Sequence, residues 1–244
     1  MSEAPASLST LPRLYVEAAL SAGAVLTLPV PQSHYLAQVM RRVPGDQVLL
    51  FDGTSGEWLA RIAVAGRKAV EVIVESQTRP LETTADLWLC AAPLKRGRID
   101  WVAEKACELG VARFLPVVTA RTIVDKLNRD RLRAHMVEAA EQCGRTALPE
   151  MAAPVPLAAL LRDWPAGRAL LFADETGGEP LAAACARAPA PAAFLIGPEG
   201  GFTPDERSLI RARPEAMPVS LGPRILRADT AAVAAVAVWQ SVMG

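Results

Sequence analysis

The pattern of hydrophobic and polar positions changes near residue 80, where a polar segment separates two regions of the chain. The first region contains short apolar runs of β-strand length, at Leu14–Val16, Val25–Leu28, Gln47–Phe51, Trp58–Val64 and Ala69–Val74. DGTSG (residues 52–56) predicts a turn, and a short helix is predicted near His34–Met40. Five strands and one helix predict a small β-barrel over residues 1–78, beginning with a loose tail over residues 1–11.

The second region, residues 79–244, has longer units in which strand patterns alternate with helix patterns. The polar segment SQTRPLETTAD (residues 76–86) contains a proline and is predicted to link the two regions. The predicted strands are residues 87–92, 114–118, 168–172, 192–196 and 217–221, and the predicted helices are residues 98–109, 129–143, 180–188 and 229–242. This alternation predicts an α/β fold with a parallel sheet covered on both faces. Such sheets bind ligands at the carboxyl ends of their strands.

The stretch LIGPEGGFTPDE (residues 195–206) places a glycine-rich turn between a predicted strand and a further helix. Thr203 is the predicted N-cap, Pro204 the first helical residue, and Glu206 closes a capping box. Strand, glycine loop and helix is also the layout of a phosphate-binding loop, yet Glu199 lies inside this turn. The Lys-Ser/Thr pair of a P-loop is absent, and the glycines lack GxGxxG spacing.

Two loops could form a ligand site, IGPEGG (residues 196–201) and LGPRILR (residues 221–227). Their glycines and prolines would present backbone N–H and C=O groups on a stiff surface, which suits a flat, uncharged heterocycle. Leu221, Ile225 and Leu226 would add apolar walls. The alternative is a pair of tight turns with no ligand, and the pattern alone leaves both open.

The last predicted helix, residues 229–242, carries almost no charge and has small apolar residues on all sides. A helix of this kind is predicted to be buried all round. Burial in a subunit interface is one explanation, and a deep internal position is the other.

Composition narrows the class of protein. With 244 residues and 51% hydrophobic residues, the chain can build a sizeable core, and its 26 basic and 26 acidic residues balance to a net charge of 0. This balance argues against coating nucleic acid by bulk charge but allows a local basic patch. The four cysteines are far apart, which indicates free thiols in a reducing cytoplasm. The longest apolar run, residues 231–239, is shorter than the about 20 residues that a membrane span needs.

Basic residues gather at predicted strand ends and helix starts. Lys95, Arg96 and Arg98 form one group, and Arg145 ends the segment EAAEQCGR (residues 138–145). They could hold phosphates, or they could be solvated charges. The histidines, His34 and His135, have no GxSxG motif and no metal-ligand spacing around them, so we expect neither a Ser-His-Asp triad nor a metal site.

Taken together, these segments resemble the RsmE family of 16S rRNA (uracil-N3) methyltransferases, in the SPOUT superfamily. The matching residues are His34–Arg42 with Gly45-Asp46, Lys95, Glu104–Gly110, Glu138–Arg145, Ile196–Phe202 and Leu221–Ala231. The resemblance runs from about residue 13 to the end. It implies a PUA-like RNA-binding barrel followed by a SPOUT domain with a deep trefoil knot.

The resemblance also implies the chemistry and the partners. The cofactor would be S-adenosylmethionine, and the substrate would be uridine 1498 of 16S rRNA within the 30S subunit. The enzyme would be a cytoplasmic homodimer with its sites near the subunit interface, without a membrane anchor or a metal. Two rivals stay open: a SPOUT methyltransferase for another rRNA or tRNA base, and a non-catalytic RNA-binding protein. A third, a nucleotide- or nicotinamide-binding enzyme, is disfavoured by the missing phosphate-binding motifs.

Site residues follow from the matching positions. Catalytic candidates are Arg227, as a cation that stabilises a uracil anion, Arg145, second for that role, and Glu199, as a base or an orienting group. The cofactor would contact Phe172, Ile196, Gly197, Pro198, Glu199, Gly200, Gly201, Leu221, Gly222, Ile225 and Leu226. RNA would contact Arg13, His34, Arg41, Arg42, Lys95 and Arg96. One departure concerns LRADTA, where the family usually has LRTETA, so that Ala228 and Asp229 replace a threonine and a glutamate.

Overall fold

The structure, a computed structural model, describes residues 8–66, 69–124 and 126–243. The chain divides into two compact units. The first takes the chain up to Thr83 together with Ala140–Ala147, and the second takes Thr84–Ala139 and Leu148–Gly244. The first unit is therefore discontinuous in sequence, which no local pattern predicts.

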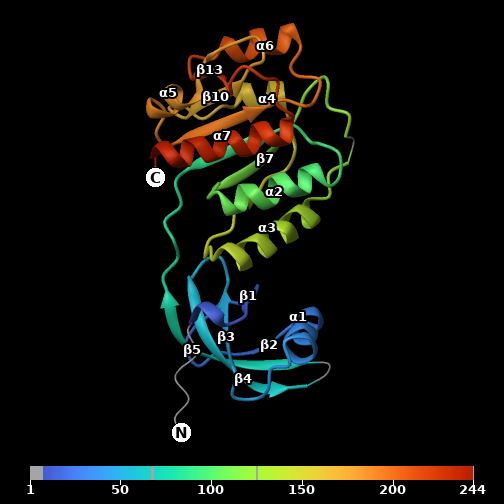
Figure 1. The fold of residues 1–244 in the computed structure, drawn as a ribbon, viewed down its shortest axis with the longest axis vertical. Coiled ribbons are helices and arrows are strands. Elements are labelled where there is room, and N and C mark those ends of the chain that lie inside the picture. The colour runs from blue at the N-terminus through green and yellow to red at the C-terminus, as the bar shows by residue number, and fades with distance from the viewer. Residues whose placement is uncertain (1–7, 67–68, 125, 244) are drawn as a thin grey trace. The chain divides into compact units, whose positions relative to one another are not determined.

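The first unit is built on a curled five-stranded sheet with the order β1–β3–β4–β5–β2 (Figure 1). Its strands are β1 (Arg13–Tyr15), β2 (Val25–Thr27), β3 (Gln47–Phe51), β4 (Glu57–Ala65) and β5 (Val70–Arg79). Strand β1 pairs with β3 in parallel, and the other neighbours are antiparallel. Three register shifts interrupt the β4–β5 pairing, and such irregularities bend the strands. The five predicted strands are confirmed.

The predicted helix of the first unit is confirmed in place but starts earlier. It comprises α1 (Val30–His34) and a π-helical turn η2 (Tyr35–Val39), and it begins at Val30 because Pro31 suits the first turn of a helix. The predicted loose tail is wrong at Leu8–Thr10, which form the short 3-10 helix η1, while residues 1–7 lie outside the described residues. The predicted linker is wrong over residues 76–79, because pairing with β4 continues β5 to Arg79.

Alternate residues of the strands fill the core of the first unit. Ile62 in β4 and Val72 in β5 are fully buried, together with Leu36 from η2. The hydroxyl of Ser33 joins the helix to this sheet, since it donates to the Leu28 carbonyl (2.9 Å) and accepts from the Val70 N–H (3.0 Å). The core is thus shared by the sheet and one short helical segment.

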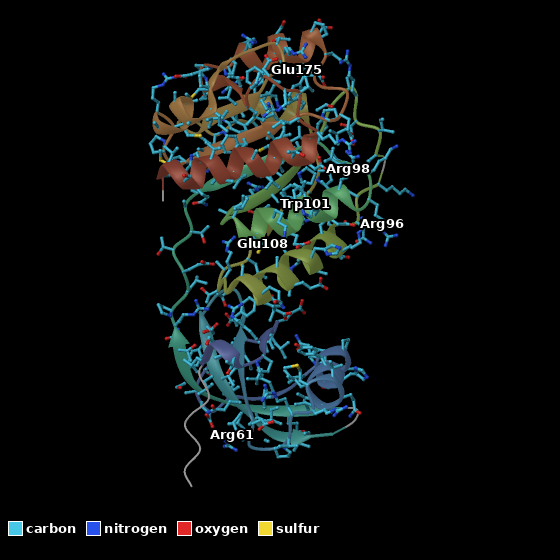
Figure 2. All side chains as sticks on the ribbon, viewed as in Figure 1. Arg61, Arg96, Arg98, Trp101, Glu108 and Glu175 are labelled. Atoms are coloured by element: carbon cyan, nitrogen blue, oxygen red, sulfur yellow. The ribbon has the colours of Figure 1, made fainter. Side chains whose placement is uncertain are left out.

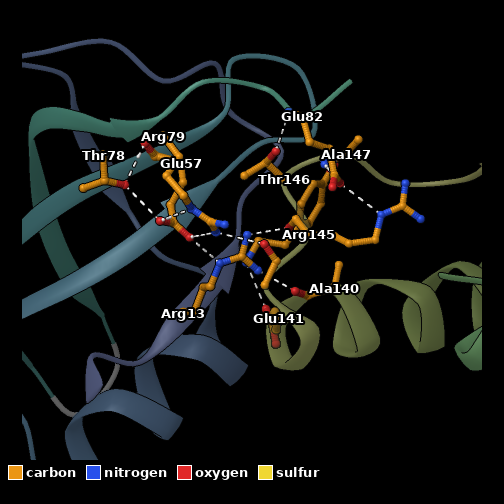
Figure 3. A network of polar contacts seen from close by, with 12 residues as sticks. Arg13, Glu57, Thr78, Arg79, Glu82, Ala140, Glu141, Arg145, Thr146 and Ala147 are labelled. Atoms are coloured by element: carbon orange, nitrogen blue, oxygen red, sulfur yellow. Dashed lines mark hydrogen bonds and ion pairs between the residues drawn. The ribbon is translucent and has the colours of Figure 1, made fainter. Parts of the chain in front are cut away.

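A buried carboxylate organises the polar side of the first unit (Figure 3). Glu57 accepts hydrogen bonds from Arg13 Nε (2.5 Å), Arg79 Nη2 (2.7 Å) and Thr78 Oγ1 (2.9 Å). Arg13 in turn donates to the carbonyl oxygens of Ala140 and Arg145. Glu57 therefore holds the guanidinium that joins residues 140–147 to β1.

The second unit contains an eight-stranded parallel sheet with the order β11–β13–β10–β12–β6–β7–β8, and β9 pairs with β7. All strand pairings among its described residues are parallel, as predicted. The strands are β6 (Leu87–Ala91), β7 (Arg113–Val118), β8 (Glu150–Met151), β9 (Val155–Pro156), β10 (Ala169–Ala173), β11 (Glu179–Pro180), β12 (Ala192–Ile196) and β13 (Ala216–Ser220). The two-residue strands β8, β9 and β11 were not predicted, because they are too short to show a period.

Helices cover both faces of this sheet (Figure 1). The α-helices that follow β6 in the chain are α2 (Arg98–Glu108), α3 (Arg129–Cys143), α4 (Leu157–Arg162), α5 (Leu181–Ala186), α6 (Pro204–Arg211) and α7 (Ala228–Met243), and residues 140–143 of α3 belong to the first unit. Helix α7 packs on β6 and β12 beside α2 and α5, and α4 packs against α6. Only α4 was missed by the sequence pattern. No helix among the described residues is long and apolar enough to cross a membrane.

The prediction that the last helix is buried all round is wrong within a single chain. Ala232, Ala235 and Trp239 on one face of α7 are buried, and the Trp239 indole donates to the Ala188 carbonyl (3.1 Å). Val233, Ala234, Ala237 and Val238 on the other face are only half-buried. The sequence predicted an apolar helix, but it could not indicate that the rest of the chain buries only one face of that helix.

Stability of the first unit should depend on the charge of Glu57. Burial raises the pKa of Glu57, but hydrogen bonds from Arg79, Arg13 and Thr78 outweigh it and lower that pKa from 4.5 to about 2. A lowered folded-state pKa contributes stability that is fully present above pH 4.5 and is lost as pH falls toward 2. We expect E57Q to lose about 3 kcal/mol of unfolding free energy at pH 7, and less at pH 2 to 3.

Chemical denaturation across this pH range measures the effect. E75Q is the matched control, since Glu75 forms an exposed ion pair with Arg61 in the same sheet and should change stability by less than about 1 kcal/mol. A loss for E57Q that stays constant from pH 7 to pH 2 would contradict the assignment.

Candidate functional site

Three loops at the carboxyl ends of β10, β12 and β13 enclose a cavity of about 440 Å³. It is lined by residues 173–175 and 177 of the first loop, 196–202 of the second, and 219–228 with 231 of the third. These strands are neighbours in the sheet order, so their loops meet at one edge. The volume lies within the range of small-molecule sites.

The loop after β12 packs tightly on an aromatic pair. The ring of the buried Phe202 lies so close to Gly197 that an added Cβ there would be 3.1 Å from it. Phe202 contacts Phe172 of β10 edge-to-face, with ring centroids 6.4 Å apart. Within the loop, the Gly201 N–H donates to the Pro198 carbonyl (2.9 Å), which closes a β-turn with Glu199 at its tip. Glycine is required at 201, where φ is +67°.

The predicted capping box at the start of α6 is confirmed. Thr203 Oγ1 accepts from the Glu206 N–H (3.2 Å), and Glu206 Oε2 accepts from the Thr203 N–H (2.9 Å). Because these bonds fix where α6 begins, they also fix the end of the glycine turn.

A buried carboxylate, Asp174, holds the loop after β10. It accepts from the Thr176 N–H (2.9 Å) and from Arg211 Nη2 of α6 (2.7 Å). Burial raises the pKa of Asp174, but the hydrogen bonds from Arg211 and Thr176 lower it to below its ordinary value. The neighbouring Glu175 pairs with Arg207 of α6 and lies against Gly201, where an added Cβ would be 2.6 Å from its Oε1.

The loop after β13 forms the third wall. Gly222 has a φ of +108° and open space where a Cβ would be. Ile225 is 88% exposed, and Arg224 and Arg227 are also exposed beside it. Asp229, at the start of α7, lies 3.9 Å from Arg98 Nη1 of α2. The aspartate of LRADTA thus stands within reach of an arginine despite its shorter side chain.

The structure brings most of the predicted cofactor and catalytic residues together. Glu199 and Arg227 line the cavity, and of the predicted cofactor contacts all except Phe172 do so, namely Ile196, Gly197, Pro198, Glu199, Gly200, Gly201, Leu221, Gly222, Ile225 and Leu226. Phe172 lies behind the wall, against Phe202. Arg145 is not a lining residue, because its buried guanidinium donates to Glu82 (3.0 Å) in the first unit.

The predicted RNA-contacting residues have different surroundings. Arg13 is largely buried in the Glu57 network. His34, the last residue of α1, is exposed, and the exposed Arg41 and half-buried Arg42 follow η2. Lys95 and Arg96 are exposed just before α2, where Figure 2 labels Arg96 and Arg98.

Three charged residues that line the cavity were not among the predicted site residues: Asp174, Glu175 and Arg224. Asp174 and Glu175 follow a predicted strand directly, in DETGG (residues 174–178), so the rule that ligands bind at carboxyl strand ends could have found them. Arg224 lies inside the LGPRILR motif, but it was not among the predicted site residues.

Comparisons with known proteins decide the family. Residues 81–240 match the RNA methyltransferase domain family, and residues 28–75 match the RNA methyltransferase PUA domain family. The ribosomal RNA small subunit methyltransferase E of Rickettsia conorii is 30% identical over 229 residues, covering 92% of this chain and 93% of that protein. This chain belongs to the ribosomal RNA small subunit methyltransferase E family.

Other members of this family are also similar to this chain. The protein of the same name from Synechocystis is 34% identical, covering 88% of this chain and 72% of that protein. A structure of ribosomal RNA small subunit methyltransferase E from Neisseria gonorrhoeae, bound to S-adenosyl methionine, is 29% identical with a TM-score of 0.86, covering 96% of this chain and 98% of that one. The resemblance predicted from the motifs is therefore confirmed, as are the α/β fold and the PUA-like domain.

The residues present fit the cofactor that the resemblance implies. The cavity has the volume for a molecule of this size, and its glycine turns offer backbone groups to an adenine ring. Glu175, which pairs with Arg207, and Glu199 place carboxylates in a wall that also carries Arg224 and Arg227, and this mixture of charges suits a ligand with both a sulfonium and a carboxylate. S-adenosylmethionine carries a sulfonium and no phosphate.

The Asp174 network should matter for both the fold and the cavity. D174N keeps the size of the side chain but removes the charge that faces Arg207 and Arg211, so we expect unfolding free energy to fall by about 2 kcal/mol. We expect a smaller loss of unfolding free energy than for breaking a fully buried ion pair, because the Arg211 side chain is 45% exposed.

Chemical denaturation at pH 7 measures this loss. E179Q is the control, since Glu179 pairs with a largely exposed Arg187 and its loss should cost less than about 0.5 kcal/mol. Equal losses for the two variants would show that Asp174 has no special role.

Proposed function

We propose that this chain uses S-adenosylmethionine to methylate N3 of uridine 1498 in 16S rRNA of the small ribosomal subunit. The observation that carries the proposal is the three-loop cavity, because two motifs of the family line it and its walls present backbone groups and carboxylates. In this proposal, residues 1–78 are a PUA-like RNA-binding barrel, and residues 79–244 are a SPOUT methyltransferase domain with a trefoil knot.

The glycine turns of the cavity would hold the cofactor. Ile196–Gly201 and Leu221–Gly222 would offer backbone hydrogen bonds to its adenine, and Leu226 would pack on an apolar part of it. When bound, S-adenosylmethionine supplies an electrophilic methyl group. The protein's own part is to position the uracil and to exclude water.

Two charged side chains in the cavity wall suit the uracil chemistry. Uracil N3 must lose its proton before or during attack, which leaves negative charge on O2 and O4. Arg227 would stabilise that charge as a fixed cation, and Glu199 would accept the proton or orient the arginine. Arg145, the second candidate for the cation, is engaged by Glu82, which favours Arg227.

Exposed basic residues would bind the RNA backbone. Arg41 and His34 of the first unit are available, as are Lys95 and Arg96 before α2. The net charge of 0 means that binding would come from local patches, so it should weaken as salt concentration rises. Arg13 would support the fold instead, because its side chain is only 9% exposed and pairs with Glu57.

The half-buried face of α7 supports a homodimer, which we place in the cytoplasm with its rRNA substrate. Val233, Ala237 and Val238 form an apolar surface on a helix that starts at the cavity wall. A second copy of the chain would remove this surface from water.

Arg227 gives the most direct test of the catalytic role. We expect R227A to lower methyl transfer to purified 30S subunits at least 100-fold, because a fixed cation at the developing charge is lost. The affinity for S-adenosylmethionine, measured by calorimetry, should change by less than about threefold. R162A is the control, because Arg162 is an exposed surface residue paired with Asp163, and it should methylate at the wild-type rate. Wild-type turnover by R227A would reject the assignment.

The substrate base is tested separately. Mass spectrometry of 16S rRNA from a deletion strain should show the loss of a single N3-methyluridine. An unchanged spectrum would reject uridine N3 as the target. Loss of a methyl group from another 16S rRNA base, or from other rRNA or tRNA of the same strain measured in parallel, would favour the corresponding alternative.

A further inference from the structure

The loop after β7 forms a rigid turn beside the cavity. The buried Thr119 donates its N–H to Thr122 Oγ1 (2.9 Å), and the Thr122 N–H donates to the Thr119 carbonyl (3.1 Å). Arg121 projects from this closed turn and is exposed. It lines no part of the cavity, and no sequence motif singled it out.

Two charge-assisted hydrogen bonds connect this turn to the loop after β12. Arg121 Nη1 donates to the Gly200 carbonyl (2.5 Å), and the Ala120 N–H donates to Glu206 Oε1 (2.7 Å). Glu206 is the same residue that closes the capping box of α6. Hydrogen bonds to charged groups are stronger than neutral ones, so the β7 loop holds both the glycine turn, at Gly200, and the start of α6 that follows it, at Glu206.

The contact with Arg121 also fixes one particular peptide group. The carbonyl of Gly200 accepts from Arg121, while the N–H of the same peptide, on Gly201, donates to the Pro198 carbonyl (2.9 Å). An added Cβ on Gly200 would lie 3.3 Å from Arg121 Cδ, which is a tight contact. A Cβ at position 200 would therefore require the Arg121 side chain to shift slightly away from the turn.

We propose that Arg121 is a positioning residue for methyl transfer. By holding the Gly200 carbonyl, it fixes the turn at residues 198–201, and with it the place of Glu199 and the backbone groups of the cavity wall. The proposal rests on the proposed function for what this turn binds. The guanidinium acts through the turn and does not itself contact the cofactor.

Binding of S-adenosylmethionine to the full-length protein is the first measurement. We expect R121A to weaken the affinity measured by calorimetry about tenfold and to lower kcat on 30S subunits by about tenfold or more, because a displaced wall misplaces the reacting groups. R121K should recover part of the loss, since lysine can still donate to a carbonyl. R162A, which removes an exposed arginine elsewhere in the same unit, should behave as wild type.

Melting temperature and amide exchange separate positioning from general stability. Melting temperatures within about 2 °C of wild type would show that all variants fold, and amide exchange at Gly201 should speed up in R121A.

The outcomes are distinct. Wild-type affinity and kcat in R121A, or unchanged amide exchange at Gly201 in that variant, would overturn the proposal. If the wild-type protein binds S-adenosylmethionine but methylates no uridine, the proposed substrate fails while the affinity and exchange measurements still decide the role of Arg121. Faster amide exchange at Gly201 together with weakened S-adenosylmethionine binding in R121A would support the positioning role of Arg121.

Discussion

Parallel strands all end at the same edge of a sheet, and the candidate site depends on that constraint. Strands β10, β12 and β13 are neighbours in the sheet although 47 residues separate Ala169 from Ala216 in sequence. Their loops must therefore meet, and each can contribute short, glycine-rich backbone to one cavity. The loop after β7 reaches the same edge, which lets Arg121 support a turn two strands away.

Contacts with neighbouring side chains, most of them charged, restrict the flexible glycine-rich turn in the cavity wall. A turn with three glycines has many accessible conformations in isolation, so a single shape must be imposed by its neighbours. Here Phe202 fills the space beside Gly197, Glu175 lies against Gly201, and Arg121 holds the carbonyl of Gly200. Asp174 and Glu206 then fix these neighbours through α6 and the β7 loop.

The sequence predicted helices and strands that are long enough to show a hydrophobic period. It did not predict features that depend on contacts between residues far apart in sequence. Helix α3 was predicted at its observed bounds, Arg129–Cys143, whereas the six-residue α4 was missed. The cavity residues on glycine loops were predicted, since their motifs are local. The burial of Arg13 and Arg145 was not, because their partners Glu57 and Glu82 lie tens of residues away. For the same reason no pattern indicated that β5 reaches Arg79.

The discontinuity of the first unit has a consequence for how the protein can be divided. A fragment that ends at residue 83 would keep the sheet but would leave the guanidinium of Arg13 without the carbonyl oxygens of Ala140 and Arg145. Cutting the chain at the polar segment therefore severs a folding unit. Separate expression of the N-terminal part would need residues 140–147 supplied as well, so this family member is better handled as one piece than as two modules.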